Sequence, residues 1–356
     1  MAVAKPDNPL VPHVEVLVNG SALSAEAEAH IADVAVEDDV ALPSMFAIEL
    51  TGSDDQDEEV PWVDDDLFAV GNAVEVKMGY VDDVATVIKG EIVALEPAFS
   101  LDCLPSLTVR GYDRRHRLIR GRKTRTFVQQ KDSDIASQIA SEVGLSAQAE
   151  DSAVVHDYVL QANQTDMEFL QERARRINYE VVVDDKTLVF RPVGNAAAEV
   201  VTLTMRDDLL EFLPRLSAMR QLSEVAVHGW SPKDKKGIVS SAKAGDETAV
   251  MGGNQSGAAL VKSAFEAGVG VVTDRPVMTQ AEADQIAKAR FNGVVLALVT
   301  GEATCLGRTD VRAGDVIKID GVGSRFGGPY YVTAVAQRYS PDGGYHTQFT
   351  LRRNAV

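Results

Sequence analysis

Side chains that could carry catalysis or bind a metal occur in this sequence, but their spacing selects no site. Among the 356 residues are six histidines, and none pairs with another histidine or with a cysteine at metal-ligand spacing. Carboxylates are abundant enough to supply a glycosidase pair, yet no two of them stand in a context that distinguishes them. The histidines are His13, His30, His116, His156, His228 and His346.

Glycine-rich segments also lack the surroundings that nucleotide binding requires. The stretch GVGSRFGG, 321–328, stands between strand-like segments, whereas a dinucleotide loop precedes a helix. The stretch GGNQSG, 252–257, lies in a loose polar segment without a strand–helix context. The chain has no Walker A loop, no His-Glu-x-x-His pair and no Gly-x-Ser-x-Gly turn. The sequence therefore predicts a protein that is not an enzyme and that uses no cofactor and no metal.

An acidic run, DDQDEEVPWVDDD at 54–66, is the strongest candidate for a cation site. It lacks the alternating ligands, central glycine and terminal glutamate of an EF-hand loop. Such runs are usually solvated loops, and this interpretation is the one we favour over a calcium site. Trp62 within the run indicates that part of it packs on the protein.

The composition describes a globular protein with a large negative charge. The formal net charge is −18, which argues against nucleic-acid binding because phosphate contacts need a basic surface. Apolar residues make up 45% of the chain, enough for a real core. Cys103 and Cys305 suit buried thiols of a reducing compartment. The N-terminus resembles no secretory signal and no apolar run would span a bilayer, so we expect no membrane insertion.

The best-specified element is a helix followed by a hairpin, within 161–192. Thr165 and Glu168 have the spacing of a capping box, and Leu170 belongs to the apolar stripe that follows. The segments YEVVV and KTLVFRP, separated by DD, predict two strands and a turn. Placing aspartate at Phe169 or Leu170 is expected to unfold this module, because it would bury a charge.

A basic stretch at 110–125 reverses the charge of the acidic chain locally. Arg114, Arg115 and Arg117 are our candidates for an interface with an acidic surface, either of a partner or of the chain itself. A solvated face is the alternative interpretation. Two further helices are expected, one capped by Ser133 and one opened by Thr279 with Glu282.

Two distant segments repeat one pattern. In VGNAVEVKMGY and AGDVIKIDGVG, Gly71 matches Gly314, and each turn is followed by an alternating strand. Later strands, EIVAL with YVTAV and LTVRGYD with FTLRRNA, match in the same order and align Arg110 with Arg352. The repeat predicts two similar β-domains joined by helical material.

Several segments resemble the baseplate hub family of contractile tails, also called the late control gene D family. They are VRGYDRRHRLIRGRKTRTF, SDIASQIASEVGL and, most specifically, LQANQTDMEFLQERARRINYEVVV; DRPVMTQAEADQIAKARFN and the last strands are also similar. Relatives include the hub of tailed phages and the N-terminal part of the type VI secretion spike protein. The resemblance implies a homotrimer with two tube-type β-barrels per subunit, which joins a hexameric inner tube to a trimeric spike. This chain ends after the second barrel, so we expect the spike to be a separate protein.

The expected fold is α+β and mainly β, with two tube-type β-barrel domains and helix-containing connecting segments. The first barrel is expected at 1–112, a bracing domain at 113–203, the second barrel at 204–235 with 296–356, and an inserted segment at 236–295. The expected function is a structural hub of a phage tail or injection system. Such a protein is made in the bacterial cytoplasm and then sits in the baseplate with the spike, the tube and other baseplate proteins. The alternative is a cell-wall-active hydrolase that uses β-domains for binding.

Overall fold

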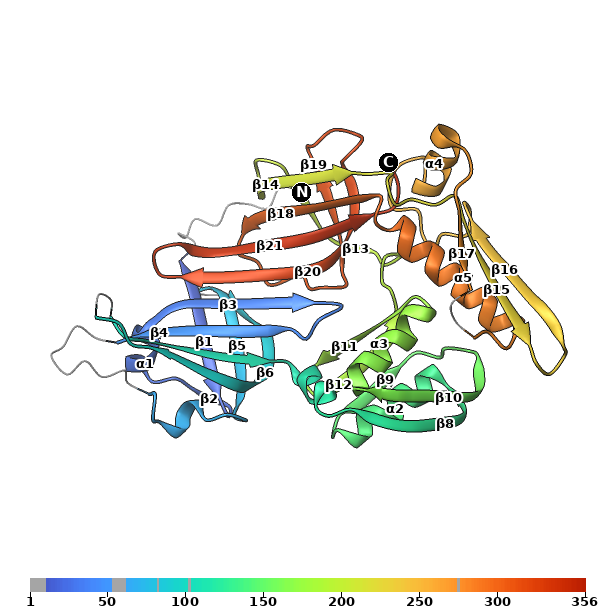
Figure 1. Cartoon of the computed structure of the whole chain (residues 1–356). Coiled ribbons are helices and arrows are strands. Elements are labelled where there is room, and N and C mark those ends of the chain that lie inside the picture. Colours follow the sequence, from blue (N-terminus) through green and yellow to red (C-terminus); the bar gives the residue numbers. More distant parts are fainter. Residues whose placement is uncertain (1–10, 53–61, 82, 102–103, 274–275) are drawn as a thin grey trace.

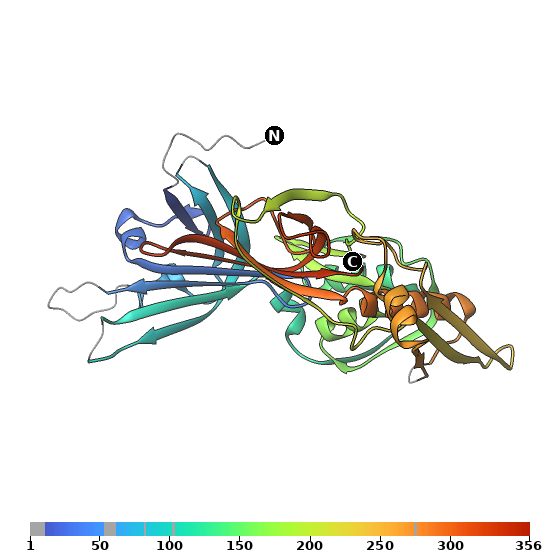
Figure 2. The same cartoon turned by 90° about the horizontal axis from the view of Figure 1, so that it is seen from above.

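The computed structural model describes residues 11–52, 62–81, 83–101, 104–273 and 276–356. It confirms a mainly β fold. Within the described residues, one sheet of 13 strands runs through both halves of the molecule in the order β14-β18-β21-β20-β3-β4-β7-β6-β5-β1-β2, with β19 and β13 branching from β20. Two further parts lie beside this sheet and extend to the same side of it (Figures 1 and 2).

The first barrel is built from strands that follow one another in the first part of the chain. β6 pairs with β5 through its first half and with β7 through its second half, so it bends the sheet around a core. Its elements are β1 (Pro12–Val18), β2 (Ser21–Ala22), α1 (Ala25–Ala29), β3 (Ile31–Asp39), β4 (Met45–Thr51), η1 (Asp66–Phe68), β5 (Ala73–Tyr80), β6 (Asp83–Ala98) and β7 (Ser106–Tyr112).

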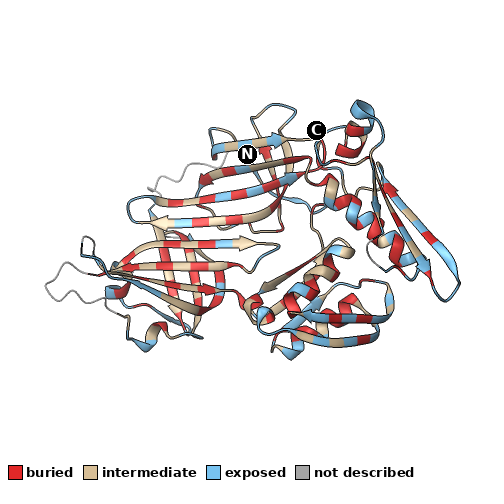
Figure 3. Cartoon of the chain, in the orientation of Figure 1, coloured by how far each residue is buried: buried red, intermediate tan, exposed pale blue. Residues whose placement is uncertain are grey.

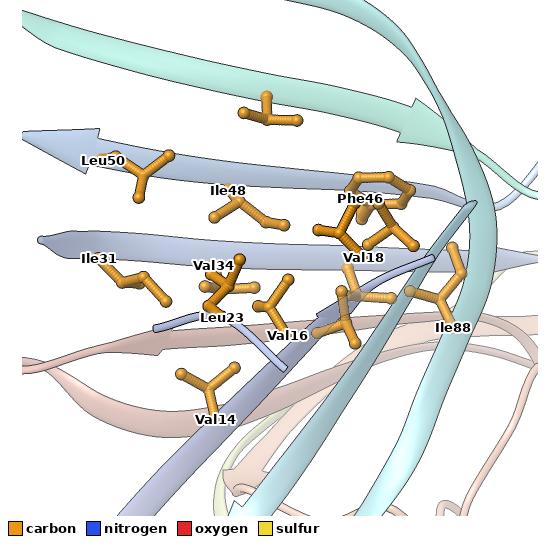
Figure 4. Close-up of a cluster of buried hydrophobic side chains, with 14 of the residues drawn as sticks. Val14, Val16, Val18, Leu23, Ile31, Val34, Phe46, Ile48, Leu50 and Ile88 are labelled. Atoms are coloured by element: carbon orange, nitrogen blue, oxygen red, sulfur yellow. The ribbon is translucent and has the colours of Figure 1, made fainter. Parts of the chain in front are cut away.

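Alternation along these strands places every second side chain in the core. Val34 and Val36 of β3 and Phe46, Ile48 and Leu50 of β4 are fully or almost fully buried. They meet side chains from β1 and β6 across the interior (Figure 4). The same alternation appears as bands of buried and exposed residues along the strands in Figure 3. This is the pattern of a sheet with one face on a core and one face in solvent.

The second barrel repeats this arrangement with strands that lie before and after the inserted segment. β20 pairs with β19 at its start and with β21 along the rest of its length. β13 pairs parallel with β19, whereas β1 pairs antiparallel with β5 in the first barrel. The strands are β13 (Glu199–Thr204), β14 (Leu209–Leu216), β18 (Val299–Leu306), β19 (Val316–Asp320), β20 (Gly328–Ser340) and β21 (Gly344–Arg353).

A helix-plus-hairpin module lies between the barrels in sequence. Thr165 accepts a hydrogen bond from the Glu168 N–H, and Glu168 accepts from the Thr165 N–H, which confirms the capping box. Phe169 and Leu170 are buried in the core of this module. Its elements are η2 (Arg114–Ile119), β8 (Lys123–Lys131), α2 (Asp132–Glu142), β9 (Ser146–Ala149), β10 (Val155–Gln164), α3 (Asp166–Arg176), β11 (Tyr179–Asp184) and β12 (Thr187–Pro192).

The inserted segment forms its own small sheet covered by a helix. β15 pairs with β16 and β17, and α5 packs on them to enclose a separate hydrophobic cluster. The elements are β15 (Glu224–Ser231), β16 (Lys236–Lys243), α4 (Gly257–Phe265), β17 (Val269–Val272) and α5 (Gln280–Val295). Thr279 caps α5 as expected, whereas α2 begins at Asp132 and places Ser133 inside its first turn rather than at the cap.

Strand pairing shifts two of the expected limits. β15 lies with the inserted segment and not with the second barrel, where 204–235 was expected to belong. β13 starts at Glu199 and pairs with β19, so the second barrel includes residues that were assigned to the bracing domain. Alternation predicts that a segment is a strand, but the partner of that strand is set by segments far away in the sequence.

Candidate assembly interface

The two glycines of the sequence repeat occupy the same position in the two barrels. Gly71 and Gly314 have φ angles of 98° and 97°, a region that favours glycine. The Gly71 N–H donates to Ile92 O at 2.9 Å, and the Gly314 N–H donates to Val332 O at 2.8 Å. The N–H of Ile92 returns a bond to Asn72 O at 3.0 Å, and that of Val332 to Asp315 O at 2.9 Å. The same turn therefore occurs once in each barrel.

The equivalence extends through the strands that follow. A β-bulge interrupts the pairing of β6 with β7 between Ile92 and Ala94, and another interrupts β20 with β21 between Val332 and Ala334. A second pair of matching bulges lies in β3 and β14, at Ile31/Asp33 and Leu209/Glu211. Because bulges fix the register of their neighbours, each strand of one barrel can be aligned with a strand of the other.

This alignment corrects one detail of the sequence repeat. Arg110 pairs with Ala94, and Thr350 pairs with Ala334, which is the counterpart of Ala94. Thr350 is therefore the counterpart of Arg110, and Arg352, which the sequence alignment chose, corresponds to Tyr112. A shift of two residues in this alignment cannot be detected from the sequence, because it leaves every side chain on the same face of the strand.

The barrels meet where β3 pairs antiparallel with β20. The paired residues run from Ala334 with Asp39 to Tyr339 with Val34. Tyr345 of β21 is buried in the first barrel's core, where its ring lies 6.0 Å from that of Tyr80. We call this contact the internal seam; it makes the run of strands from β14 to β6 one sheet with a shared outer face (Figure 1).

The shared outer face carries charges of both signs. A hollow of about 510 Å³ lies over the internal seam and is lined by acidic side chains from both barrels. Among these are Glu37 and Asp39 of β3 and Glu302 of β18. Beside it, the Arg110 guanidinium donates to both carboxylate oxygens of Glu96, at 3.0 and 3.2 Å. Within the described residues, no group of three or more His, Cys, Asp or Glu side chains could hold a metal ion.

The candidate interface arginines lie mainly inside the chain. Arg114 and Arg115 are 6% and 1% exposed, so these two side chains meet the chain's own acidic groups and present no surface to a partner. Arg115 donates to Asp113 Oδ2 at 2.7 Å and to Ser44 Oγ at 2.6 Å. Arg117 is half-exposed and donates to Glu91. The basic stretch satisfies the chain's own acidic groups, which was one of the interpretations of its sequence.

Glu91 is the acceptor at the centre of this cluster. It receives hydrogen bonds from Arg114 at 3.1 Å, from His116 at 2.8 Å and from Arg117 at 3.0 Å. Burial raises the pKa of Glu91, but the hydrogen bonds from Arg117 and His116 and the arginine charges outweigh it and lower the pKa to about 2. The three donors follow β7 and Glu91 lies in β6, so the sequence hints at this role only by placing a glutamate within the run GEIV.

The bracing module contacts both barrels and the inserted segment. Gln171 of α3 donates to Ala41 O beside the first barrel. The Tyr331 hydroxyl of the second barrel donates to Glu180 Oε2 of β11 at 2.6 Å, and burial followed by the Glu180 charge raises the pKa of Tyr331. Arg176 of α3 donates to Glu282 of α5 at 2.8 Å. These contacts place Thr165, Glu168, Phe169 and Leu170 in a unit that connects the other parts.

The remaining candidates for chemistry have structural partners. His156 lies 3.4 Å from Asp132 and shares it with Arg173, in a buried network. Trp62 packs edge-on against His30 with ring centroids 5.1 Å apart, whereas 54–61 of the acidic run lie outside the described residues. Cys305 is buried, and burial raises its pKa to about 12; Cys103 lies outside the described residues. Of the glycine-rich segments, 252–257 does lead into a helix, α4, which starts at Gly257.

Comparisons with known proteins connect this fold with tail proteins. A family model described as the Alg8 N-terminal domain matches residues 8–340. A 43 kDa tail protein of prophage MuSo2 from Shewanella oneidensis superposes with a TM-score of 0.73 at 13% identity, covering 96% of this chain and 98% of that one. A tail protein from Neisseria meningitidis gives 0.70 at 16% identity, with 96% and 97% covered.

An Escherichia coli protein described as a component of the type VI secretion system also shares the fold. Its TM-score is 0.60 at 13% identity, with 96% of this chain and 77% of that chain covered. No curated protein sequence matches the chain. Among the described residues, no helix is long and apolar enough to cross a membrane. The fold of this chain is thus that of phage tail and type VI secretion proteins.

Proposed function

The chain belongs to the family described as the Alg8 N-terminal domain, and we propose that it is a structural hub in the baseplate of a contractile tail or injection system. The observation that carries this proposal is the duplicated barrel, with the same turn and the same bulges in each copy, held in one continuous sheet. The fold shared with tail proteins supports it. A structural role needs no reacting groups, and the titratable side chains described above are engaged with one another.

The finer role is a symmetry adaptor between a hexameric tube and a trimeric spike. A homotrimer of a chain with two equivalent barrels presents six similar units around one axis. It can therefore match a six-fold ring on one side and a three-fold object on the other. The spike is a separate protein in this proposal, and other baseplate proteins surround the hub.

The shared outer face of the sheet would line the channel of such a ring. The strands that complete each barrel, β1 and β5 in one and β13 and β19 in the other, lie on the core side of the sheet. The opposite face is common to both barrels and is free of them. It carries acidic side chains at Glu37, Glu49 and Glu302 and basic ones at Arg338 and Arg352, so a channel lined by this face is polar.

The bracing module and the inserted segment would lie outside the ring. Both extend away from the barrels to one side (Figure 2). In this role the two barrels form the ring, and the bracing domain and the inserted segment support it from outside. The protein would be made in the bacterial cytoplasm and end in the baseplate of the finished particle.

Electron cryo-microscopy of the particles that contain this protein tests the proposal. We expect three copies around the axis, with the two barrels of each copy related by a rotation of about 60°. Two barrels without a common axis would contradict the adaptor role. Hydrolysis of bacterial cell-wall material by the purified chain would contradict a purely structural one.

A further inference from the structure

The two strands that pair in the internal seam each have a counterpart in the other barrel, and both counterparts have an unpaired edge. β3 is the counterpart of β14, and the second half of β20 is the counterpart of Ala94–Ala98 in β6, by the register of their shared neighbours. β3 and β20 pair with each other. β14 pairs only with β18 among the described strands, and Ala94–Ala98 pairs only with β7. Each therefore has one unpaired edge, a liability that proteins normally cover.

We propose that β14 of one copy pairs antiparallel with Ala94–Ala98 of the next copy, in the register of the internal seam. This inference rests on the trimeric hub proposed above and specifies how its copies join. Carrying the internal register across places Leu95 opposite Leu216, Glu96 opposite Arg215 and Ala98 opposite Leu213. The sheet would then continue from copy to copy without an open edge.

Charge complementarity supports this register. Glu96 and Arg215 replace Ala336 and Glu37, the pair at the same place in the internal seam. Directly opposed side chains on neighbouring strands interact, and opposite charges there are favourable. The pair lies on the shared outer face, where Glu96 already accepts a hydrogen bond from Arg110.

Exposed apolar side chains at the open edges point to the same partner. Phe99 is 68% exposed, and its counterpart Tyr339 packs against the core of the first barrel across the internal seam. In the proposed register Phe99 faces Phe212 of the neighbouring copy. Leu213 is 57% exposed and would be covered by Ala98. These apolar side chains are exposed in the single chain, and their burial between two copies would favour association.

Two prolines lie opposite one another in the proposed register. Val40 N–H donates to Thr333 O in the internal seam, so hydrogen-bonded pairs alternate from there and include Gln337 with Val36. The counterparts of these two residues are Pro97 and Pro214, which have no N–H to donate. In the proposed register both prolines fall in one pair, which forms neither of its two hydrogen bonds and leaves the hydrogen-bonded pairs on either side intact; a register shifted by two residues would spread the same loss over two pairs. The missing bonds also make this seam weaker than the internal one.

Cysteine cross-linking of assembled particles tests the seam. Ala98 and Leu213 would form a pair without mutual hydrogen bonds, whose Cα atoms lie about 4.5 Å apart and suit a disulfide. The full chain with Ala98→Cys and Leu213→Cys should give a covalent trimer on oxidation. Each single-cysteine variant controls for the native thiols. A shifted pair, Ala98→Cys with Leu216→Cys, should cross-link far less; equal cross-linking of the shifted pair, or monomer alone, would overturn the proposal.

A charge exchange provides the second test. Glu96→Arg or Arg215→Glu alone should weaken association by about fivefold per seam, because each places like charges opposite one another. The double variant should recover it, since every seam then holds the exchanged pair. A trimer by light scattering that forms no cross-link and is indifferent to these charges would reject the seam and leave the hub intact. A single copy per axis in the particles would reject both.

Discussion

Apart from the parallel strand β13, the two barrels keep the same strand pairing, but they fill their interiors from different strands. In the first barrel Phe46 of β4 is fully buried, and glycines face it from β6 and β7. A methyl group added at Gly111 would collide with the Phe46 ring and with the Glu91 carbonyl. Gly90 meets the Tyr112 carbonyl in the same way. These two glycines leave the space that the aromatic ring occupies.

The second barrel exchanges the large and small residues. The counterpart of Phe46 is Gly301, by the pairing of β18 with β21. The counterparts of Gly90 and Gly111 are Tyr330 and Leu351, both fully buried. Bulk lost from one strand is supplied by its neighbours, so the core stays filled. The duplicated feature is therefore the backbone register, with its turns and bulges, and not the side chains of the core.

The last strand of each barrel is followed or ended by a buried arginine, and the two arginines are held by different groups. We call these two arginines, with the groups that hold them, the anchors of the barrels. After β7, Arg115 forms a buried ion pair with Asp113. At the end of β21, Arg353 is fully buried and donates to the Met251 and Gly327 carbonyls, at 2.9 and 2.7 Å. The first anchor depends on an opposite charge, whereas the second depends on carbonyl groups and on the Tyr330 ring 5.5 Å away.

Removal of Arg115 is the strongest way to separate the two anchors. Arg115→Ala leaves the buried Asp113 carboxylate unpaired, and we expect a loss of about 3–5 kcal/mol in the free energy of unfolding. Thermal and urea unfolding of the full chain would measure it. The paired variant Asp113→Asn with Arg115→Met should recover much of the loss. No recovery would show that the hydrogen bonds from Arg115 to Ser44 Oγ and to the backbone carbonyl of Asp39, and not the charge, hold this end of the barrel.

Adding a methyl group to a core glycine tests whether large and small side chains have changed places between the barrels. Gly111→Ala should cost about 1–3 kcal/mol, because its methyl group has no room beside the Phe46 ring and the Glu91 carbonyl. The matched control is Gly301→Ala in the second barrel, whose nearest obstacle is Leu213 O at 3.0 Å. We expect the control to be clearly milder in the same unfolding measurement. Equal losses would mean that backbone constraints, and not the aromatic ring, decide both positions.

Acid should weaken the first barrel's junction with the bracing module. The pKa of Glu91 is lowered to about 2, below its ordinary value, so the charged group stabilises the folded chain at neutral pH. This contribution falls as the pH drops below the ordinary glutamate pKa and is gone below about 2. Glu91→Gln should flatten the pH dependence of stability in that range. An unchanged slope would assign the acid sensitivity to other carboxylates.

The sequence predicted local structure better than the contacts between segments. The turn at Gly71 and Gly314 and the cap at Thr165 depend on neighbouring residues, and both occur as expected. The pairing of β3 with β20 was not anticipated, because alternation shows which face of a strand is buried but not which strand lies beside it. The sequence does not decide whether Arg114 and Arg115 meet a partner or the chain's own acidic groups, because Glu91 and Asp113 can be identified as their partners only in space. A glutamate within a run of buried residues, as in GEIV, was the one available signal.

The distance along the chain between β3 and β20 has a consequence for synthesis. The strands of the first barrel end at Tyr112, whereas β20 begins only at Gly328. At bacterial translation rates, about 10–40 seconds pass between the two events. During that interval all strands of the first barrel have been made, while the strand that pairs with its β3 edge has not. The stretch between the barrels thus sets a delay during which a chaperone, or the chain's own bracing module, has to shield that edge from premature pairing.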